Sequence, residues 1–141
     1  MASGQTSNYG LNQWAAEDKV LREEFNQDNV SLDAALMEIK QLIPRIVTGT
    51  YTGNGKGSQF ISLEISPKVV YVCNEEGQTF NDSGDYYYGG LAFVGFPAKS
   101  DLTENSVEIE ENGFRVRSVI ATSSRVASNV SGQVYYYVAL A

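Results

Sequence analysis

The sequence contains no histidine and only one cysteine, Cys73, and these two shortages exclude several kinds of site. Without histidine there is no Ser-His-Asp or Cys-His catalytic group and no histidine-based zinc or haem site. One cysteine forms no intramolecular disulfide, and its place in the apolar run VVYVC favours a buried, unreactive thiol. Acidic residues are plentiful, but no pair stands out as a two-carboxylate catalytic site. We therefore expect a protein that is not an enzyme, with no catalytic, cofactor-binding or metal-binding residues.

Long apolar runs and basic charge are also scarce. No run reaches the roughly 18 apolar residues of a transmembrane helix, so membrane insertion is not expected. The N-terminal segment MASGQTSNYG lacks the basic and apolar regions of a secretory signal. The chain has 10 Lys and Arg residues against 17 Asp and Glu residues, a formal net charge of −7. An acidic chain repels phosphate backbones, so nucleic acid is not expected as a partner.

Two short motifs have tempting compositions but unsuitable spacing. The glycine-rich GNGKGS, residues 53–58, does not match a phosphate-binding P-loop, because glycine rather than Ser or Thr follows Lys56. The segment NDSGD, residues 81–85, offers oxygen ligands but lacks the spacing and the distal glutamate of an EF-hand. A surface loop is favoured for both, with calcium binding the weaker alternative for the second.

Glycine and proline are absent from residues 18–43, as expected for one long helix. Asp18 is a candidate N-cap and Pro44 ends the helix. About 26 residues at 1.5 Å each span roughly 39 Å, whereas a β-domain of this size is only some 25–30 Å across. A helix packed on its own domain is therefore the weaker alternative, and a parallel homo-oligomeric bundle is favoured.

An apolar stripe follows the heptad positions of this helix. With Phe25 at position a, the polar exception is Asp28 at position d, and the stripe widens toward the C-terminal end. A wide stripe of large aliphatic residues favours a coiled coil of three helices over one of two helices. The predicted homotrimer interface consists of Leu21, Phe25, Leu32, Ala35, Leu36, Ile39 and Leu42.

The rest of the chain has the pattern of an all-β domain. Apolar and β-branched segments at 45–53, 58–65, 68–74, 86–96, 106–110, 114–121 and 133–141 alternate with turn signals, which favours an antiparallel β-sandwich. The run KVVYVCN predicts a central strand buried on both faces. The turn at residues 111–113 predicts a hairpin, whereas EEGQTFNDSGD and SSRVASNVSG are expected to be loops.

A tyrosine triplet follows the polar loop at 81–85. Alternation along a strand puts Tyr86 and Tyr88 on one face and Tyr87 on the other, so at least one ring is expected to be exposed. Core packing is the favoured role of these rings. The alternative is a glycan or protein site made of Asp82, Asp85 and the tyrosines, because aromatic rings stack on sugars and carboxylates bind hydroxyls.

The N-terminal region resembles a known family. The residues that carry the resemblance are Asn8, Tyr9, Leu11, Asn12, Gln13, Trp14, Asp18, Arg22, Phe25, Asn26, Asp28, Asn29, Leu32, Asp33, Ala35 and Leu36. This pattern resembles the N-terminal segment of tail-fibre and related virion proteins of tailed bacteriophages and prophages of Gram-positive bacteria. The region from VTGTYTGNG to VYYYVALA also looks like a β-module from the distal end of such fibres.

The resemblance implies a virion appendage in three parts. Residues 1–17 would form an attachment arm that is disordered when free and docks on other virion proteins through Tyr9, Leu11 and Trp14. Residues 18–44 would form a trimeric coiled coil, and residues 45–141 a β-sandwich head that contacts a host-surface glycan or protein. The chain lacks the long shaft of many fibres, so tail, baseplate and head positions stay open, as does a purely structural adaptor.

Overall fold

The computed structural model describes residues 1–99, 104–121 and 124–141, and it divides into two compact units. The N-terminal unit is Met1–Pro44 and the β unit is Arg45–Ala141. The boundary falls after the proline that was expected to end the helix.

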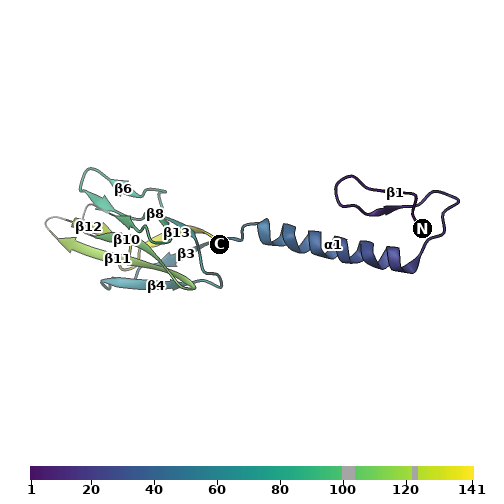
Figure 1. Cartoon of the computed structure of the whole chain (residues 1–141). Helices are drawn as coiled ribbons and strands as arrows, with labels where there is room; N and C mark the ends of the chain where they lie inside the picture. The colour runs from purple at the N-terminus through teal and green to yellow at the C-terminus, as the bar shows by residue number, and fades with distance from the viewer. Residues whose placement is uncertain (100–103, 122–123) are drawn as a thin grey trace. The chain divides into compact units, whose positions relative to one another are not determined.

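The N-terminal unit contains one helix and a short hairpin (Figure 1). Strands β1 (Gly4–Gln5) and β2 (Asn12–Gln13) pair antiparallel, and helix α1 (Arg22–Leu42) follows. The expected start of the helix was wrong, because Asp18 is not the N-cap. The N-cap residue is Leu21, whose backbone is extended, and the Asp18 carboxylate accepts hydrogen bonds from Ser3 and Ala15 instead.

The β unit contains eleven described strands. They are β3 (Ile46–Thr52), β4 (Ser58–Ser62), β5 (Val69–Asn74), β6 (Phe80–Asn81), β7 (Tyr86–Tyr87), β8 (Gly90–Phe93), β9 (Ala98–Lys99), β10 (Asn105–Glu110), β11 (Gly113–Ala121), β12 (Ser124–Ala127) and β13 (Val134–Leu140). A four-stranded sheet has the order β3-β13-β5-β8, and a seven-stranded sheet has the order β6-β7-β12-β11-β10-β9 with β4 paired to β11. The predicted mainly β architecture with an N-terminal helix is therefore confirmed.

The two sheets share one hydrophobic core, in which Tyr51 from β3 packs edge-on against Phe114 from β11, with ring centroids 6.2 Å apart. The other fully buried side chains of this core come from both sheets: Val70, Val72, Ala92, Tyr135, Ala139, Val107 and Val116. The core therefore lies between the inner faces of the two sheets.

These strands confirm one local prediction and contradict two others. The hairpin of β10 and β11 is confirmed, and its turn residue Asn112 has the left-handed φ of +58° that such a turn requires. Residues 75–85 and 123–132 were both expected to be loops, and this was partly wrong because the first segment contains β6 and the second contains β12. Ser123 lies outside the described residues. Strict antiparallel pairing was also wrong, since β7 and β12 run parallel.

The four-stranded sheet differs from the expectation on its second face. Strand β5 is central, but its second face is only partly covered within this chain, because Tyr71 on that face is exposed while Cys73 is buried. Cross-strand pairs in register point to the same face. We define the outer face of this sheet as Ile46, Thr48, Thr50, Thr52, Val69, Tyr71, Cys73, Leu91, Phe93, Val134, Tyr136, Val138 and Leu140.

Candidate functional site

The N-terminal arm is fixed to its own helix by two carboxylates. The backbone N–H of Asn12 donates to the two oxygens of Asp28 at 3.0 and 3.1 Å, and the Asn12 amide donates to one of them at 3.0 Å. Trp14 donates from its indole Nε1 to Glu24 at 3.1 Å, and the amino group of Met1 lies 3.9 Å from the same carboxylate. Asp28, the polar exception in the heptad stripe, therefore holds the arm.

The three residues predicted to attach the arm to a particle have different surroundings. Leu11 and Trp14 are half-buried within the N-terminal unit, whereas Tyr9 is 58% exposed between β1 and β2. The expectation of a disordered arm was wrong, because the hairpin and its hydrogen bonds to the helix give the arm a defined fold. Of these three side chains, Tyr9 is the one most available to a partner.

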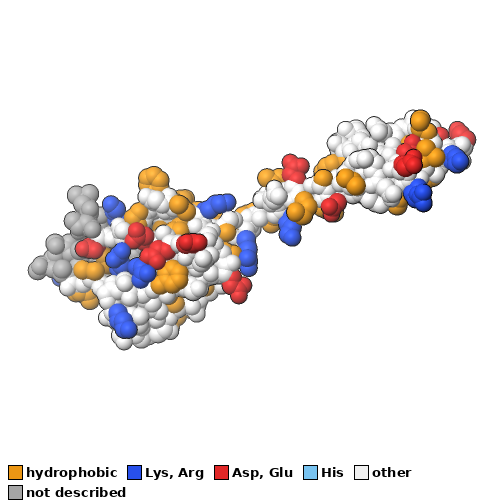
Figure 2. Space-filling view, turned by 60° about the horizontal axis from the view of Figure 1, so that its bottom comes forward, with side chains coloured by type: hydrophobic (Ala, Val, Ile, Leu, Met, Phe, Trp, Pro, Cys, Tyr) orange, Lys and Arg blue, Asp and Glu red, His pale blue; other side chains and the backbone are white. Residues whose placement is uncertain are grey.

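The apolar stripe of α1 is open to solvent. No residue of α1, which is described throughout, is buried, although the arm meets the stripe at Asp28. Figure 2 shows hydrophobic side chains spaced along this part of the chain. The exposed members of the predicted interface are Phe25, Leu32, Leu36, Ile39 and Leu42, whereas Leu21 and Ala35 are half-buried. The stripe is thus available for association along most of the helix.

The rings of the tyrosine triplet fall into two groups. Tyr86 and Tyr88 stack on one side with ring centroids 6.3 Å apart, as alternation predicts, and the guanidinium of Arg125 lies 5.3 Å from the Tyr86 ring. Tyr87 packs against Phe80 at 4.6 Å. All three tyrosines are half-buried, so packing accounts for much of their surface, and each keeps some exposure.

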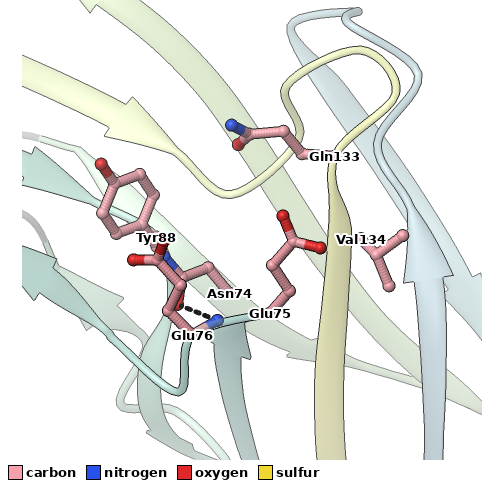
Figure 3. A pocket seen from close by; sticks show the side chains of 6 residues that line it. All are labelled: Asn74, Glu75, Glu76, Tyr88, Gln133 and Val134. Atoms are coloured by element: carbon pink, nitrogen blue, oxygen red, sulfur yellow. Dashed lines mark hydrogen bonds between the residues drawn. The ribbon is translucent and has the colours of Figure 1, made fainter.

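Tyr88 borders a small polar pocket of about 120 Å³ (Figure 3). Glu75 and Glu76 enter it from the turn after β5, where the Asn74 side chain accepts a hydrogen bond from the Glu76 N–H at 3.1 Å. Gln133 enters from the start of β13, and Val134 completes the lining. Carboxylates, an amide and a phenol can hydrogen-bond to hydroxyl groups, but the volume suits only part of a sugar ring.

Glycine 89 allows this arrangement. A Cβ at Gly89 would lie 2.1 Å from the backbone oxygen of Val72, so only glycine lets the chain pass this close to β5. Tyr88 is thereby held beside the turn after β5. Glu75 and Glu76 lie near Tyr88 because β5 pairs with β13 and β8. The spacing of these residues in the sequence did not predict that pairing.

Tyr87 borders a larger, more open hollow of about 350 Å³. Its aromatic wall is the Tyr87 and Phe80 pair, and Thr79 and Lys99 supply polar groups. The remaining lining residues are Gly89, Gly90, Leu91, Pro97 and Ala98. An exposed aromatic wall beside hydroxyl and amino groups can stack on the C–H face of a sugar and hydrogen-bond to its hydroxyls.

The structure does not bring Asp82 and Asp85 into either hollow. Both are exposed on the loop before β7, where Arg125 donates to the Gly84 carbonyl at 2.9 Å. Their predicted grouping with the tyrosine rings as a ligand site stays a prediction. Phe80 and Glu75 border the two hollows instead, and the sequence pattern did not indicate either residue, because both lie in a segment expected to be a loop.

Two other kinds of feature are absent from the described part of the chain. No group of three or more Cys, Asp or Glu side chains is arranged to hold a metal ion among residues 1–99, 104–121 and 124–141. Over the same ranges, no helix has both the length and the apolar composition needed to cross a membrane. Comparisons of the chain with protein-family models, curated proteins and solved structures gave no match.

Proposed function

We propose that this chain is a non-enzymatic appendage of a bacteriophage virion, anchored through its N-terminal unit. In this proposal α1 associates three copies, and the β unit is presented to a glycan or protein on the host surface. Other virion proteins of the tail, baseplate or capsid are the anchoring partners, and the protein is made in the host cytoplasm.

The observation that carries the proposal is the uncovered apolar stripe of α1. A 21-residue helix with no buried residue gains little from its own chain, because tertiary packing supplies most helical stability in proteins. Association of several copies would remove Phe25, Leu32 and Ile39 from water at once. Trimeric assembly is the form that the widened stripe favours.

The assignment to a virion is supported by the sequence resemblance in residues 8–36. The arm-to-helix hydrogen bonds involve Asn12, Trp14 and Asp28, which belong to the resembling pattern. They leave Tyr9 exposed at the end of a folded hairpin. A pre-organised aromatic side chain is a suitable anchor, because little conformational entropy is lost when it docks.

Particle localisation tests this proposal directly. An antibody against residues 45–141 should label virions purified from cells that carry the gene, as seen by electron microscopy. Deleting residues 1–14 should leave the oligomer intact, because most of the stripe lies beyond the deletion, while labelling of particles is lost. Unlabelled wild-type particles would contradict virion localisation, and normal incorporation of the deletion variant would contradict anchoring by the arm.

Host-surface binding is tested by labelling cells with the fluorescent full-length chain. We expect Phe80→Ala to reduce labelling at least about fivefold, since stacking on an aromatic ring is lost. Phe60→Ala is the matched control, because Phe60 has a similar exposed fraction, 38% against 41%, and borders neither hollow. Equal loss in both variants would contradict a glycan site at Phe80.

A structural adaptor without its own ligand is the second candidate function. The observation that favours it is the small size of the hollows. The polar pocket, about 120 Å³, is below the 300–1,000 Å³ common for ligand sites, and the hollow beside Tyr87, about 350 Å³, is at the lower end of that range. In that case the wild-type chain would label particles but would bind no fraction of the host cell wall.

A further inference from the structure

The outer face of the four-stranded sheet has the composition of a buried surface, although this chain leaves it open. None of its thirteen defined positions carries a charge. The seven-stranded sheet is different, because its outward side carries ion pairs between Glu108 and Arg117 and between Glu110 and Arg115. The unequal distribution of charge marks the outer face as the surface that another body covers.

The exposed apolar area of this face is large. Tyr71, Phe93 and Tyr136 are 37%, 47% and 48% exposed, and Phe96 is 74% exposed. Phe96 belongs to the same side, since it pairs directly with Phe93 across a tight turn. At about 200 Å² for each aromatic side chain, these four residues alone expose on the order of 400 Å². Ile46 and Leu91 add further exposed area.

The exposed apolar area of this face is in the range of patches that often mark interaction sites. The largest apolar patch on a typical monomer is about 300–600 Å², whereas a stable interface buries about 800 Å² on each partner. The aromatic residues alone reach the range of the largest ordinary patches, and with the aliphatic residues the face approaches the size of a standard interface. Exposure of this extent is typical of interaction sites.

We propose that the outer face of the four-stranded sheet is covered by other copies of this chain, so that the β units of the oligomer contact one another through it. This inference rests on the proposed association through α1. An acidic chain packs against its own copies most favourably through an uncharged face, because its other surfaces repel. Subunit contacts between identical chains are also the apolar class of interface.

The order of the chain supports a second copy as the occupant. Ile46, on the outer face, follows the last apolar residue of the helical stripe, Ile43, by only three positions. Association through α1 would therefore hold the outer faces of neighbouring copies at high effective concentration, so even a weak contact between them would form. The hollow beside Tyr87 meets the edge of the outer face at Leu91, whereas its aromatic wall of Phe80 and Tyr87 comes from the other sheet.

The chain's own helix is a less suitable occupant. Strands β3 and β13 have seven residues each, about 23 Å, whereas the 21 residues of α1 extend about 32 Å. A helix lying on the sheet would leave part of its stripe in water. One helix is also about 10 Å wide, which is less than four strands at about 4.8 Å spacing need to be covered.

Thiol labelling of the full-length chain tests this inference. In a Cys73→Ser background, cysteine is introduced either on the outer face by Leu91→Cys or on the other sheet by Ile120→Cys. The two side chains are exposed to similar extents in a single copy, 50% and 65%. Circular dichroism verifies folding, light scattering gives the mass of each labelled sample, and a maleimide dye measures the rate.

We expect the cysteine at position 91 to react at least about tenfold more slowly than that at position 120 in the associated chain, because the interface must open first. When Phe25→Asp separates the copies, the two rates should become equal. An associated chain with equal rates would overturn the inference and leave association through α1 intact. A wild-type chain that is monomeric would overturn both association through α1 and the contact through the outer face. Slow labelling of the cysteine at position 91 in that monomer would indicate that the chain's own helix covers the outer face.

Discussion

At the residue scale, two buried tyrosine hydroxyls hold the segment after β12. Tyr51 donates to the Ser128 carbonyl at 2.6 Å, and Tyr135 donates to the Ala127 carbonyl, while their rings stack at 5.0 Å. Burial, the largest cause, raises the pKa of Tyr51 well above its usual value, so the phenol stays a hydrogen-bond donor at any ordinary pH. These hydroxyls connect strands β3 and β13 of one sheet to the end of β12 in the other.

We predict that Tyr51→Phe lowers the free energy of unfolding of the β unit by about 1–3 kcal/mol, since the buried Ser128 carbonyl loses its donor. Urea unfolding followed by circular dichroism measures the change. Both variants are made in the Phe25→Asp background, which separates the copies. Tyr136→Phe is the matched control, because that hydroxyl belongs to a side chain that is exposed in a single copy and its loss should cost little. An equal effect of the two variants would show that the buried hydrogen bond does not stabilise the unit.

Asp18 gives the arm a dependence on pH. The Ser3 hydroxyl and the Ala15 N–H donate to its carboxylate, and these hydrogen bonds lower the pKa of Asp18 below its usual value of 3.8. A lowered pKa in the folded arm means that the carboxylate stabilises the fold above pH 3.8 and ceases to do so as the pH falls through the lowered pKa.

We therefore predict that acidification from pH 7 to pH 3 loosens the arm, which the fluorescence of Trp14, the only tryptophan, should report. Asp18→Asn should shift the fluorescence toward the acid value already at pH 7. Glu17→Asn is a suitable control, since Glu17 is exposed. A fluorescence signal that is unchanged by both acid and Asp18→Asn would contradict the anchoring role of Asp18.

At the element scale, the helix carries its apolar residues where no other element of the N-terminal unit covers them. Phe25→Asp places a charge at heptad position a, which costs free energy in the associated state and almost none in the separated one. We predict that this variant dissociates the oligomer, as measured by light scattering, while the circular dichroism of the β strands is retained. Val30→Asp is the control, because Val30 is exposed at position f, off the stripe. Dissociation by both variants, or by neither, would contradict the heptad assignment.

The elements also show how much of the fold was accessible from the sequence. Long alternating segments gave β3, β11 and β13 near their true bounds, because burial of one face fixes their pattern. Strands β6 and β12 were missed because their polar residues and short lengths resemble loops. They are strands only because they pair in the fold, β12 with β11 and β7, and β6 with β7.

The candidate site was less accessible than the fold. The pairing of Tyr86 with Tyr88 on one side follows from strand alternation and was confirmed. The neighbours of these rings come from β6, from the turn after β5 and from β13, which are distant in sequence and meet through sheet pairing. The role of Asp28 was also not predictable, because a heptad pattern indicates which side chains lie on one face of a helix and does not indicate that the preceding arm hydrogen-bonds to one of them.

At the scale of the whole molecule, each of the two units leaves one apolar surface exposed to solvent. The N-terminal unit uses its carboxylates to hold the arm and leaves the stripe of α1 open. The β unit buries a core between two sheets and leaves the outer face of one sheet uncharged and open. Both open surfaces are apolar, and both would be removed from water by association of identical chains.

The mass of the full-length protein in dilute buffer tests this account most directly. Multi-angle light scattering should give three times the chain mass of 15.4 kDa, and the value should persist at high salt, because apolar burial rather than ion pairing holds the copies together. A mass of 15.4 kDa at micromolar concentration would contradict the trimeric appendage and, with it, the proposed use of both open surfaces.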